Sequence, residues 1–210
     1  MNNQKNIVKV VAAIAVIIIL GSAYYFFNIS SRDKTVVTDT IETVANKDLN
    51  FSFAFESGAT ALSSMETTPD QFGDSFLKKM YMLMETKELE IFDKAKESGE
   101  EREAPPAISV LVFERGPVNE ELASSSEEKI TQWAKDNSQF TSINLATNNI
   151  EEVEIDGVQA IHYQADGLYR QDVYVLRYGK NMYLFVGQSL AEGDYMSKAF
   201  QKVIASVSFD

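Results

Sequence analysis

The sequence predicts an α+β domain, with helices flanking an antiparallel sheet, behind one N-terminal transmembrane helix. Three observations carry this prediction. Val10–Phe27 is a run of 18 uncharged, mostly apolar residues. Residues 150–188 contain strand-like segments, several of which alternate apolar and polar side chains, separated by short turn sequences, as in a series of hairpins. Segments with helical periodicity do not alternate regularly with the strands, which favours hairpin connections over β-α-β units.

Val10–Phe27 is long enough to cross a bilayer. At about 1.5 Å per residue, such a helix spans roughly 27 Å, close to the hydrocarbon thickness. Lys9 can reach the headgroups at one end, and the aromatic residues 24–27 form an interfacial belt at the other. Residues 1–9 contain lysine and no acid, so we expect a cytoplasmic tail there and an extracytoplasmic C-terminal domain, held at the cell membrane.

The alternative is a signal peptide whose cleavage releases a secreted domain. The lysines, the apolar core Val10–Leu20 and the small residues at 21–23 fit that template. Cleavage after Ala23 would leave a mature chain beginning with four aromatic residues, so the uncleaved anchor is the preferred interpretation. Both interpretations place the domain outside the cytoplasm.

Residues 28–48 are rich in Ser, Thr, Asp and Asn and lack strong periodicity, so we interpret them as a linker. The remaining residues, 49–210, have the length of one domain. Residues 1–48 hold five basic and four acidic side chains and so carry a net charge of +1. Because the whole chain carries −12, residues 49–210 carry −13. Such a domain repels phosphates, so nucleic acid is not an expected partner. The absence of cysteine excludes disulfides and cysteine-bound metals.

The first strands are predicted by two kinds of pattern. Leu49–Glu56 alternates Leu or Phe with smaller residues, as in a strand with one apolar face. Ala107–Glu114 is an unbroken run rich in β-branched residues, which predicts a central strand. Phe76–Met84 fits either a helical period or a buried strand. We favour a strand over Met80–Met84, because the alternative helix would be unusually long.

The last third of the chain predicts an antiparallel meander. Its four strands are expected at Ile150–Ile155, Val158–Ala165, Leu168–Tyr178 and Met182–Gln188. The Asp-Gly pairs at 156–157 and 166–167 are expected to supply the positive φ angles of tight hairpin turns. Gly179-Lys180-Asn181 forms the third turn.

Three helices are expected beside the sheet. Lys87–Glu97 has an apolar face. A second helix follows the overlapping capping box at 124–128 and carries Trp133. The third covers Tyr195–Ile204, before a short terminal strand at Ser206–Phe209.

No catalytic, cofactor or metal site is expected. His162 is the only histidine, so it lacks the partners of a His-rich metal site, and we expect a structural role. Acidic clusters at 97–103 and 151–156 lack the spacing of a calcium loop. The methionines of residues 80–84 would suit an adaptable groove, but core filling is the preferred interpretation.

The candidate partner-binding residues are Tyr169, Arg170 and Asp172, which follow the turn at 166–167. Tyr and Arg contribute disproportionately to binding energy at protein interfaces, and a hairpin tip presents them to a partner. The alternative interpretation is that the turn is structural and its aromatic side chain packs across strands.

Four segments of the chain follow one another in the same order as in a known protein family. They are the Phe-rich strand at 49–55, the strand at 108–113 with its Trp-bearing helix, the I-x-G-x-x-A hairpin at 155–160, and the closing F-x-x-V-I-x-S-x-x-F at 200–209. Together they resemble the PsbP-like domain family, which includes an extrinsic photosystem II subunit and uncharacterised membrane-anchored bacterial proteins. The resemblance implies an α-β-α sandwich and a non-enzymatic accessory role. A photosynthetic function is not carried over, because that subunit lacks the anchor and the acidic linker.

These inferences predict an extracytoplasmic accessory domain that is tethered by its N-terminal helix, has no catalytic activity and no cofactor, and binds another envelope protein. The alternative is an exported domain that binds a small ligand in a groove between sheet and helices.

Overall fold

The computed structural model describes residues 40–58, 62–67, 76–114 and 127–210. Its strands are β1 (Thr40–Asn46), β2 (Phe51–Ser57), β3 (Leu62–Thr67), β4 (Leu77–Glu85), β5 (Ala107–Glu114), β6 (Glu151–Ile155), β7 (Val158–Asp166), β8 (Arg170–Tyr178), β9 (Asn181–Ser189) and β10 (Ser208–Phe209). Its helices are α2 (Thr86–Ser98), α3 (Glu127–Asp136), α4 (Ser138–Thr141), the 3-10 helix η3 (Ile143–Leu145) and α5 (Tyr195–Ser206).

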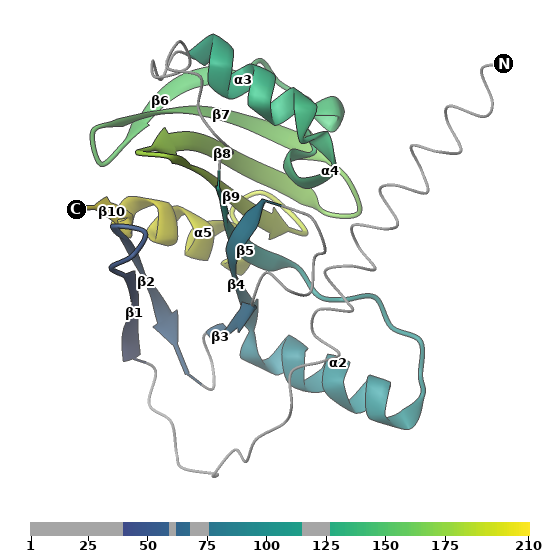
Figure 1. Cartoon of the computed structure of the whole chain (residues 1–210). Helices are drawn as coiled ribbons and strands as arrows, with labels where there is room; N and C mark the ends of the chain where they lie inside the picture. Colours follow the sequence, from purple (N-terminus) through teal and green to yellow (C-terminus); the bar gives the residue numbers. More distant parts are fainter. Residues whose placement is uncertain (1–39, 59–61, 68–75, 115–126) are drawn as a thin grey trace, which may run out of the picture.

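The ten described strands form one sheet (Figure 1). Their spatial order is β1-β2-β3-β4-β5-β9-β8-β7-β6, and β10 pairs with β2. The pairings are antiparallel, except for the short contact of Ser57 with Leu62 between β2 and β3. The predicted central position of β5 and the predicted meander of β6 to β9 are therefore confirmed.

Helices lie on both faces of the sheet (Figure 1). On one face, Ile130 and Ala134 of α3 join an apolar cluster that includes Tyr163. On the other face, Phe200 of α5 joins a second cluster that includes Phe185. The domain is mostly sheet, in an α-β-α arrangement, and successive residues of each central strand contribute to different clusters.

Helix α5 lies unusually close to β9. An ideal Cβ atom built on Gly187 would lie 2.3 Å from Cγ of Phe200, far inside van der Waals contact. Only a residue without a side chain allows the Phe200 ring to rest on the strand backbone. The close approach brings the adjacent polar residues of α5 within reach of β8.

The predicted strand at 80–84 is confirmed as part of β4. Because side chains alternate along a strand, Met80, Met82 and Met84 all enter the cluster beneath α3. Their exposed fractions are 0%, 3% and 6%, which confirms core filling. The expected helices at 87–97 and 195–204 correspond to α2 and α5, and Trp133 lies in α3.

The segment 28–48 is not a linker throughout, because its residues 40–46 form β1. This strand pairs with β2 from Thr40↔Ser57 to Asn46↔Phe51. As an edge strand it leaves most of its side chains exposed, so it lacks the apolar alternation that reveals a half-buried strand. The folded domain therefore includes residues before Leu49.

Three further elements differ from expectation. The sequence did not predict β3, α4 or η3, which are short or lack apolar periodicity. Helix α5 extends to Ser206, so the terminal strand that was expected at Ser206–Phe209 is limited to β10, Ser208–Phe209. Of the expected capping box at 124–128, residues 124–126 lie outside the described residues, and Glu127 and Glu128 begin α3.

The two Asp-Gly turns differ. Asp156 and Gly157 have φ angles of 50° and 74°, as the tight turn between β6 and β7 requires. Between β7 and β8 the last pair is Asp166↔Arg170, so the loop has three residues, and Gly167 has no positive φ. The expected tight turn at 166–167 is therefore wrong, because register and not the dipeptide sets the loop length.

Within these described ranges no helix combines the length and the apolar character needed to cross a membrane. The expected tail at 1–9, the expected anchor at 10–27 and residues 28–39 lie outside the described residues.

Candidate functional site

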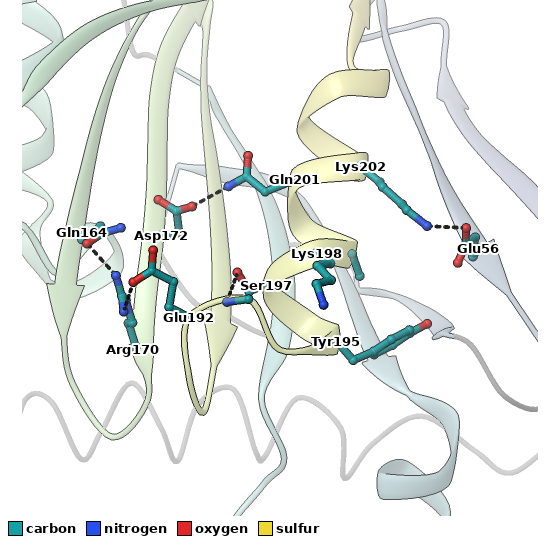
Figure 2. Close-up of a pocket in the computed structure, with 12 residues that line it drawn as sticks. Glu56, Gln164, Arg170, Asp172, Glu192, Tyr195, Ser197, Lys198, Gln201 and Lys202 are labelled. Carbon is teal, nitrogen blue, oxygen red and sulfur yellow. Dashed lines mark hydrogen bonds and ion pairs between the residues drawn. The ribbon is translucent and has the colours of Figure 1, made fainter.

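An open cavity of about 610 Å³ lies between the β7–β8 hairpin and helix α5. We call it the α5 groove. Figure 2 shows Arg170 and Asp172 of β8 on one side of α5, with Gln201 reaching toward Asp172, whereas Tyr195 and Lys202 point to the opposite side of the helix. Its lining includes Gln164, Arg170 and Asp172 from the hairpin, Glu192 from the β9–α5 loop, Tyr195, Lys198 and Gln201 from α5, and Glu56 from β2.

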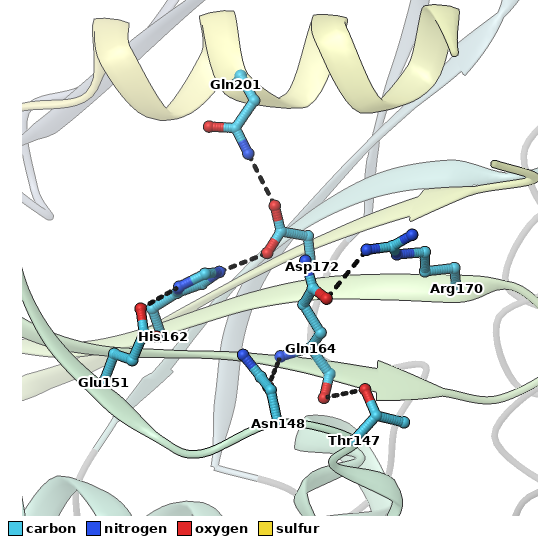
Figure 3. A network of polar contacts seen from close by, with 8 residues as sticks. All are labelled: Thr147, Asn148, Glu151, His162, Gln164, Arg170, Asp172 and Gln201. Atoms are coloured by element: carbon cyan, nitrogen blue, oxygen red, sulfur yellow. Dashed lines mark hydrogen bonds and ion pairs between the residues drawn. The ribbon is translucent and has the colours of Figure 1, made fainter. Parts of the chain in front are cut away.

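The floor of the groove is a hydrogen-bond network centred on Asp172 (Figure 3). Nε2 of His162 donates to Oδ1 of Asp172 at 2.5 Å, and Nε2 of Gln201 donates to Oδ2 at 2.7 Å. Both carboxylate oxygens therefore have partners, one on β7 and one on α5. The Asp172 side chain is 24% exposed, so these contacts are partly shielded from water.

The His162 ring is held on three sides. It stacks on Tyr174 with ring centroids 4.4 Å apart, and Nδ1 lies 3.7 Å from a carboxylate oxygen of Glu151 on the edge strand β6. The hydrogen bond to Asp172 raises the pKa of His162 above its ordinary value of 6.5. Burial opposes this rise, and the charges of Asp172 and Glu151 reinforce it.

We expect the stability that charged His162 contributes to disappear as the pH rises. Because its folded-state pKa lies above the unfolded-state value, this contribution is complete below about pH 6.5 and is lost as the pH passes through the folded-state pKa. The difference in unfolding free energy between wild type and His162→Gln, measured in urea from about pH 5.5 to 9, should shrink with rising pH. A difference that stays constant across this range would contradict the assignment. In Asp172→Asn, the NMR-measured pKa of His162 should fall.

Arg170 forms the outer wall of the groove. Its Nη2 atom donates to Oε1 of Gln164 at 3.0 Å, and Nη1 donates to a carboxylate oxygen of Glu192 at 3.2 Å. The Arg170–Glu192 ion pair connects the start of β8 with the β9–α5 loop. These two bonds use two of the five N–H donors of the guanidinium group.

Asp194 positions the loop and the first turn of α5. As the N-cap residue, it accepts a hydrogen bond from the Ser197 backbone through Oδ1 at 2.8 Å. Its Oδ2 atom accepts from the backbone of Leu190 at 2.9 Å and of Ala191 at 3.1 Å. One carboxylate thus orders both the helix start and the preceding loop.

The three candidate partner-binding residues do not form one surface. Arg170 and Asp172 line the α5 groove. The Tyr169 hydroxyl instead donates to the backbone oxygen of Ala104 at 2.7 Å, in the segment before β5. Burial is the main cause that raises the pKa of this hydroxyl.

Sequence patterns did not indicate Gln201, Glu192 or Tyr195 as groove residues. Each lies in or before an amphipathic helix, where polar residues on the outer face are ordinary. The only useful signal was Gly187 within an otherwise bulky strand, because such a glycine often marks a close backbone approach. Among the described residues, no group of three or more His, Asp or Glu could hold a metal ion.

Exposed leucines gather at the same end of the sheet. Leu145, Leu168 and Leu190 are 45%, 47% and 76% exposed. Leu145 precedes the bridge between Ala146 and Ala165, and the pairing of β8 with β9 places the loops that carry Leu168 and Leu190 side by side. We call these three leucines the loop patch, which borders Arg170.

The architecture resembles the solution structure of cyanobacterial PsbP (CyanoP) from Synechocystis sp. PCC 6803. The superposition has a TM-score of 0.50, covers 87% of this chain and 99% of that chain, and has 11% sequence identity. No family model and no curated protein matches the sequence. At this identity the likeness concerns the fold alone, and it agrees with the fold expected from the resemblance. The described domain has a PsbP-like fold.

Proposed function

We propose that this protein is a membrane-anchored extracytoplasmic accessory domain, without catalytic activity, that binds another envelope protein through the loop patch. The apolar run Val10–Phe27 supports the anchor. The PsbP-like fold supports an accessory role. The proposed binding surface depends on one observation, the exposure of the three leucines of the loop patch.

The loop patch has the composition of an interface centre. Of the seven large apolar side chains that are exposed among the described residues, its three leucines lie within two adjacent loops and the neighbouring η3. Removing exposed apolar area from water at an interface is favourable by about 25 cal/mol per Å², before the entropy and desolvation costs of association are subtracted. Arg170 beside the patch can add hydrogen bonds from its three remaining donors. An apolar centre with a polar rim is typical of protein–protein contacts.

The experiment uses the full chain in bacterial membranes, with a photo-crosslinking residue in place of Leu190. The chain should stay with the membranes in alkaline carbonate. Illumination should join it to a specific envelope protein, which mass spectrometry identifies and which is then purified. In a binding assay with that protein, the variant Leu168→Asp/Leu190→Asp should bind at least about tenfold more weakly, because each carboxylate would be desolvated at the interface.

Ile41→Asp is the matched control, because Ile41 is 67% exposed on the edge strand β1. It should bind like the wild type, and circular dichroism should show all variants folded. Equal binding by the loop-patch variant would refute the proposed surface. Release of the full chain by carbonate would refute the anchor.

A further inference from the structure

We propose that two copies of this chain associate through their edge strands β1, which pair antiparallel in a register centred on Thr43. This contact does not use the loop patch. The inference combines the open edge of β1, the direction of its backbone groups, the side chains that this register brings together and the place of β1 in the chain.

Strand β1 has an open edge. Among the described strands it pairs only with β2, and it lies at the outer margin of the sheet (Figure 1). Such an edge presents backbone N–H and C=O groups that can accept another strand, and proteins commonly protect it with charged side chains or proline. The sequence of β1 contains no proline and one charged residue, Glu42, whose carboxylate already accepts a hydrogen bond from the Ser57 hydroxyl at 2.6 Å.

The ladder to β2 determines which backbone groups of β1 point outward. Oγ of Ser206 accepts from the backbone N–H of Ala54 at 2.8 Å and donates to its C=O at 3.0 Å. Ser206 precedes β10, which pairs with the edge of β2 opposite to β1, so these groups of Ala54 point away from β1. The partner of Ala54 in β1 is Thr43, whose N–H and C=O therefore point away from β2. Those of Ile41 and Ala45 also point outward, because backbone direction alternates along a strand.

A register centred on Thr43 matches these groups between two copies. Thr43 faces Thr43 of the second copy, and Ile41 faces Ala45. Each facing pair exchanges two N–H···O bonds, so all outward groups of residues 41, 43 and 45 gain partners. Facing threonines are a favourable cross-strand pair, and Ile41, which is 67% exposed, covers Ala45. Glu42 faces Val44 of the second copy, so no like charges meet.

The other edge of the sheet is not complementary to itself. Strand β6 carries Glu151, Glu152 and Glu154 among its five residues. An antiparallel register of two β6 strands centred on Val153 places Glu152 opposite Glu154, and a register centred on either neighbour places a glutamate opposite itself. Like charges directly opposite each other are destabilising. The two edges therefore differ, since β1 can accept a copy of itself and β6 repels one.

The place of β1 in the chain favours a second copy as its partner, and this step rests on the proposed anchor. Antiparallel pairing sets the Thr40 residues of the two copies roughly 20 Å apart. Residues 28–39, between the apolar run and β1, can span up to about 40 Å, so both anchors can enter one membrane. Confinement to that membrane raises the effective concentration of one edge around the other. The net negative charge of the domain opposes association, but it is screened beyond about 8 Å at physiological ionic strength.

The test uses single cysteines, because the chain has none of its own. Full-length Thr43→Cys and Glu42→Cys are oxidised separately in bacterial membranes, and covalent dimers are measured on non-reducing gels. Facing Cα atoms of a hydrogen-bonded pair lie about 5.5 Å apart, within disulfide range, whereas diagonal neighbours lie about 7–8 Å apart, outside it. Thr43→Cys should therefore form dimers at least about tenfold faster than Glu42→Cys. Ile41→Cys and Ala45→Cys should each form few dimers alone and many when the two are co-expressed.

A proline tests the backbone pairing. In the Thr43→Cys chain, Ala45→Pro removes an outward N–H and leaves the ladder to β2 in place, so dimer formation should slow at least about tenfold. Ala45→Val keeps the N–H and should not slow it. Circular dichroism should show both variants folded.

Glu152→Cys is the matched control, because Glu152 is exposed on the other edge strand, and it should form few dimers. Leu168→Asp/Leu190→Asp should leave the Thr43→Cys rate unchanged, whereas Ile41→Asp should lower it without affecting the loop patch. Equal rates for Thr43→Cys and Glu42→Cys, or a rate unaffected by Ala45→Pro, would overturn the proposal. Carbonate extraction of the same membranes reports the anchor independently, so failure of the anchor and failure of the β1 pairing give different results.

Discussion

Gly187→Ala should lower the free energy of unfolding by about 3 kcal/mol. The added methyl group would occupy the position where the Phe200 ring rests, 2.3 Å from its Cγ atom. Phe200 is 1% exposed and cannot rotate into solvent without losing its own burial. The strand or the helix must therefore shift, which strains a closely packed core.

Urea denaturation of Gly187→Ala and of the wild type measures this loss. Gly167→Ala is the matched control, because the closest atom to its new Cβ would be the flexible end of Gln171, at 3.2 Å, and the backbone oxygen of Tyr169 at 3.7 Å is in ordinary van der Waals contact. It should change stability by less than about 0.5 kcal/mol. Adding Phe200→Leu to Gly187→Ala should cost less than the two single substitutions together, because the smaller side chain leaves room for the methyl group. A loss below about 1 kcal/mol for Gly187→Ala would show that the close approach is not required.

The same substitution should disturb the α5 groove. Gly187 pairs with Asp172 across β8 and β9, and Gln201 follows Phe200 in α5. Moving the helix away from the strand would lengthen the 2.7 Å hydrogen bond between Gln201 and Asp172. The fold and the candidate site are therefore connected through one small residue.

The sequence predicts the meander well because β6 to β9 are joined by short loops, because β6 and β7 largely keep a two-residue apolar period, and because β9 is a short unbroken apolar run between turn residues. It fails for β1, because this edge strand is stabilised by its ladder to β2 and buries little of its own surface. It fails for β3 for a related reason, since this short strand lacks apolar alternation in the sequence. A strand that is stabilised mainly by pairing with a distant strand shows little apolar pattern in its own sequence.

Sequence patterns could not predict the α5 groove, because its residues come together only in the folded chain. Asp172 and Gln201 are separated by 29 positions, and Arg170 and Glu192 by 22. Each residue alone is an ordinary polar side chain on a strand or helix. Their convergence depends on the strand register and on the closeness of α5 to β9, which are properties of the tertiary structure. The sequence marked Arg170 and Asp172 only because they follow a hairpin turn.

Phe51→Ala should lower the free energy of unfolding by about 4 kcal/mol, the largest effect we expect from a single truncation. Phe51 is 1% exposed and lies among aromatic rings from distant parts of the chain. Its ring centroid is 5.3 Å from that of Tyr183, 5.6 Å from Phe53 and 6.0 Å from Phe209. Removing it leaves a cavity that these packed rings cannot readily fill.

The substitution should also weaken the pairing of the C-terminal strand, because Phe51 pairs with Phe209 and so holds β10 against β2. Hydrogen exchange of the Asp210 amide, which donates to the backbone oxygen of Asn50 at 3.2 Å, should therefore accelerate in Phe51→Ala, beyond the change expected from global stability alone. Phe76→Ala removes the same atoms from a side chain that is 67% exposed, and should cost less than about 0.5 kcal/mol in urea. If the two substitutions cost the same, burial among the rings is not what stabilises this face of the sheet. A smaller loss for Phe51→Leu than for Phe51→Ala would instead trace the effect to the volume removed.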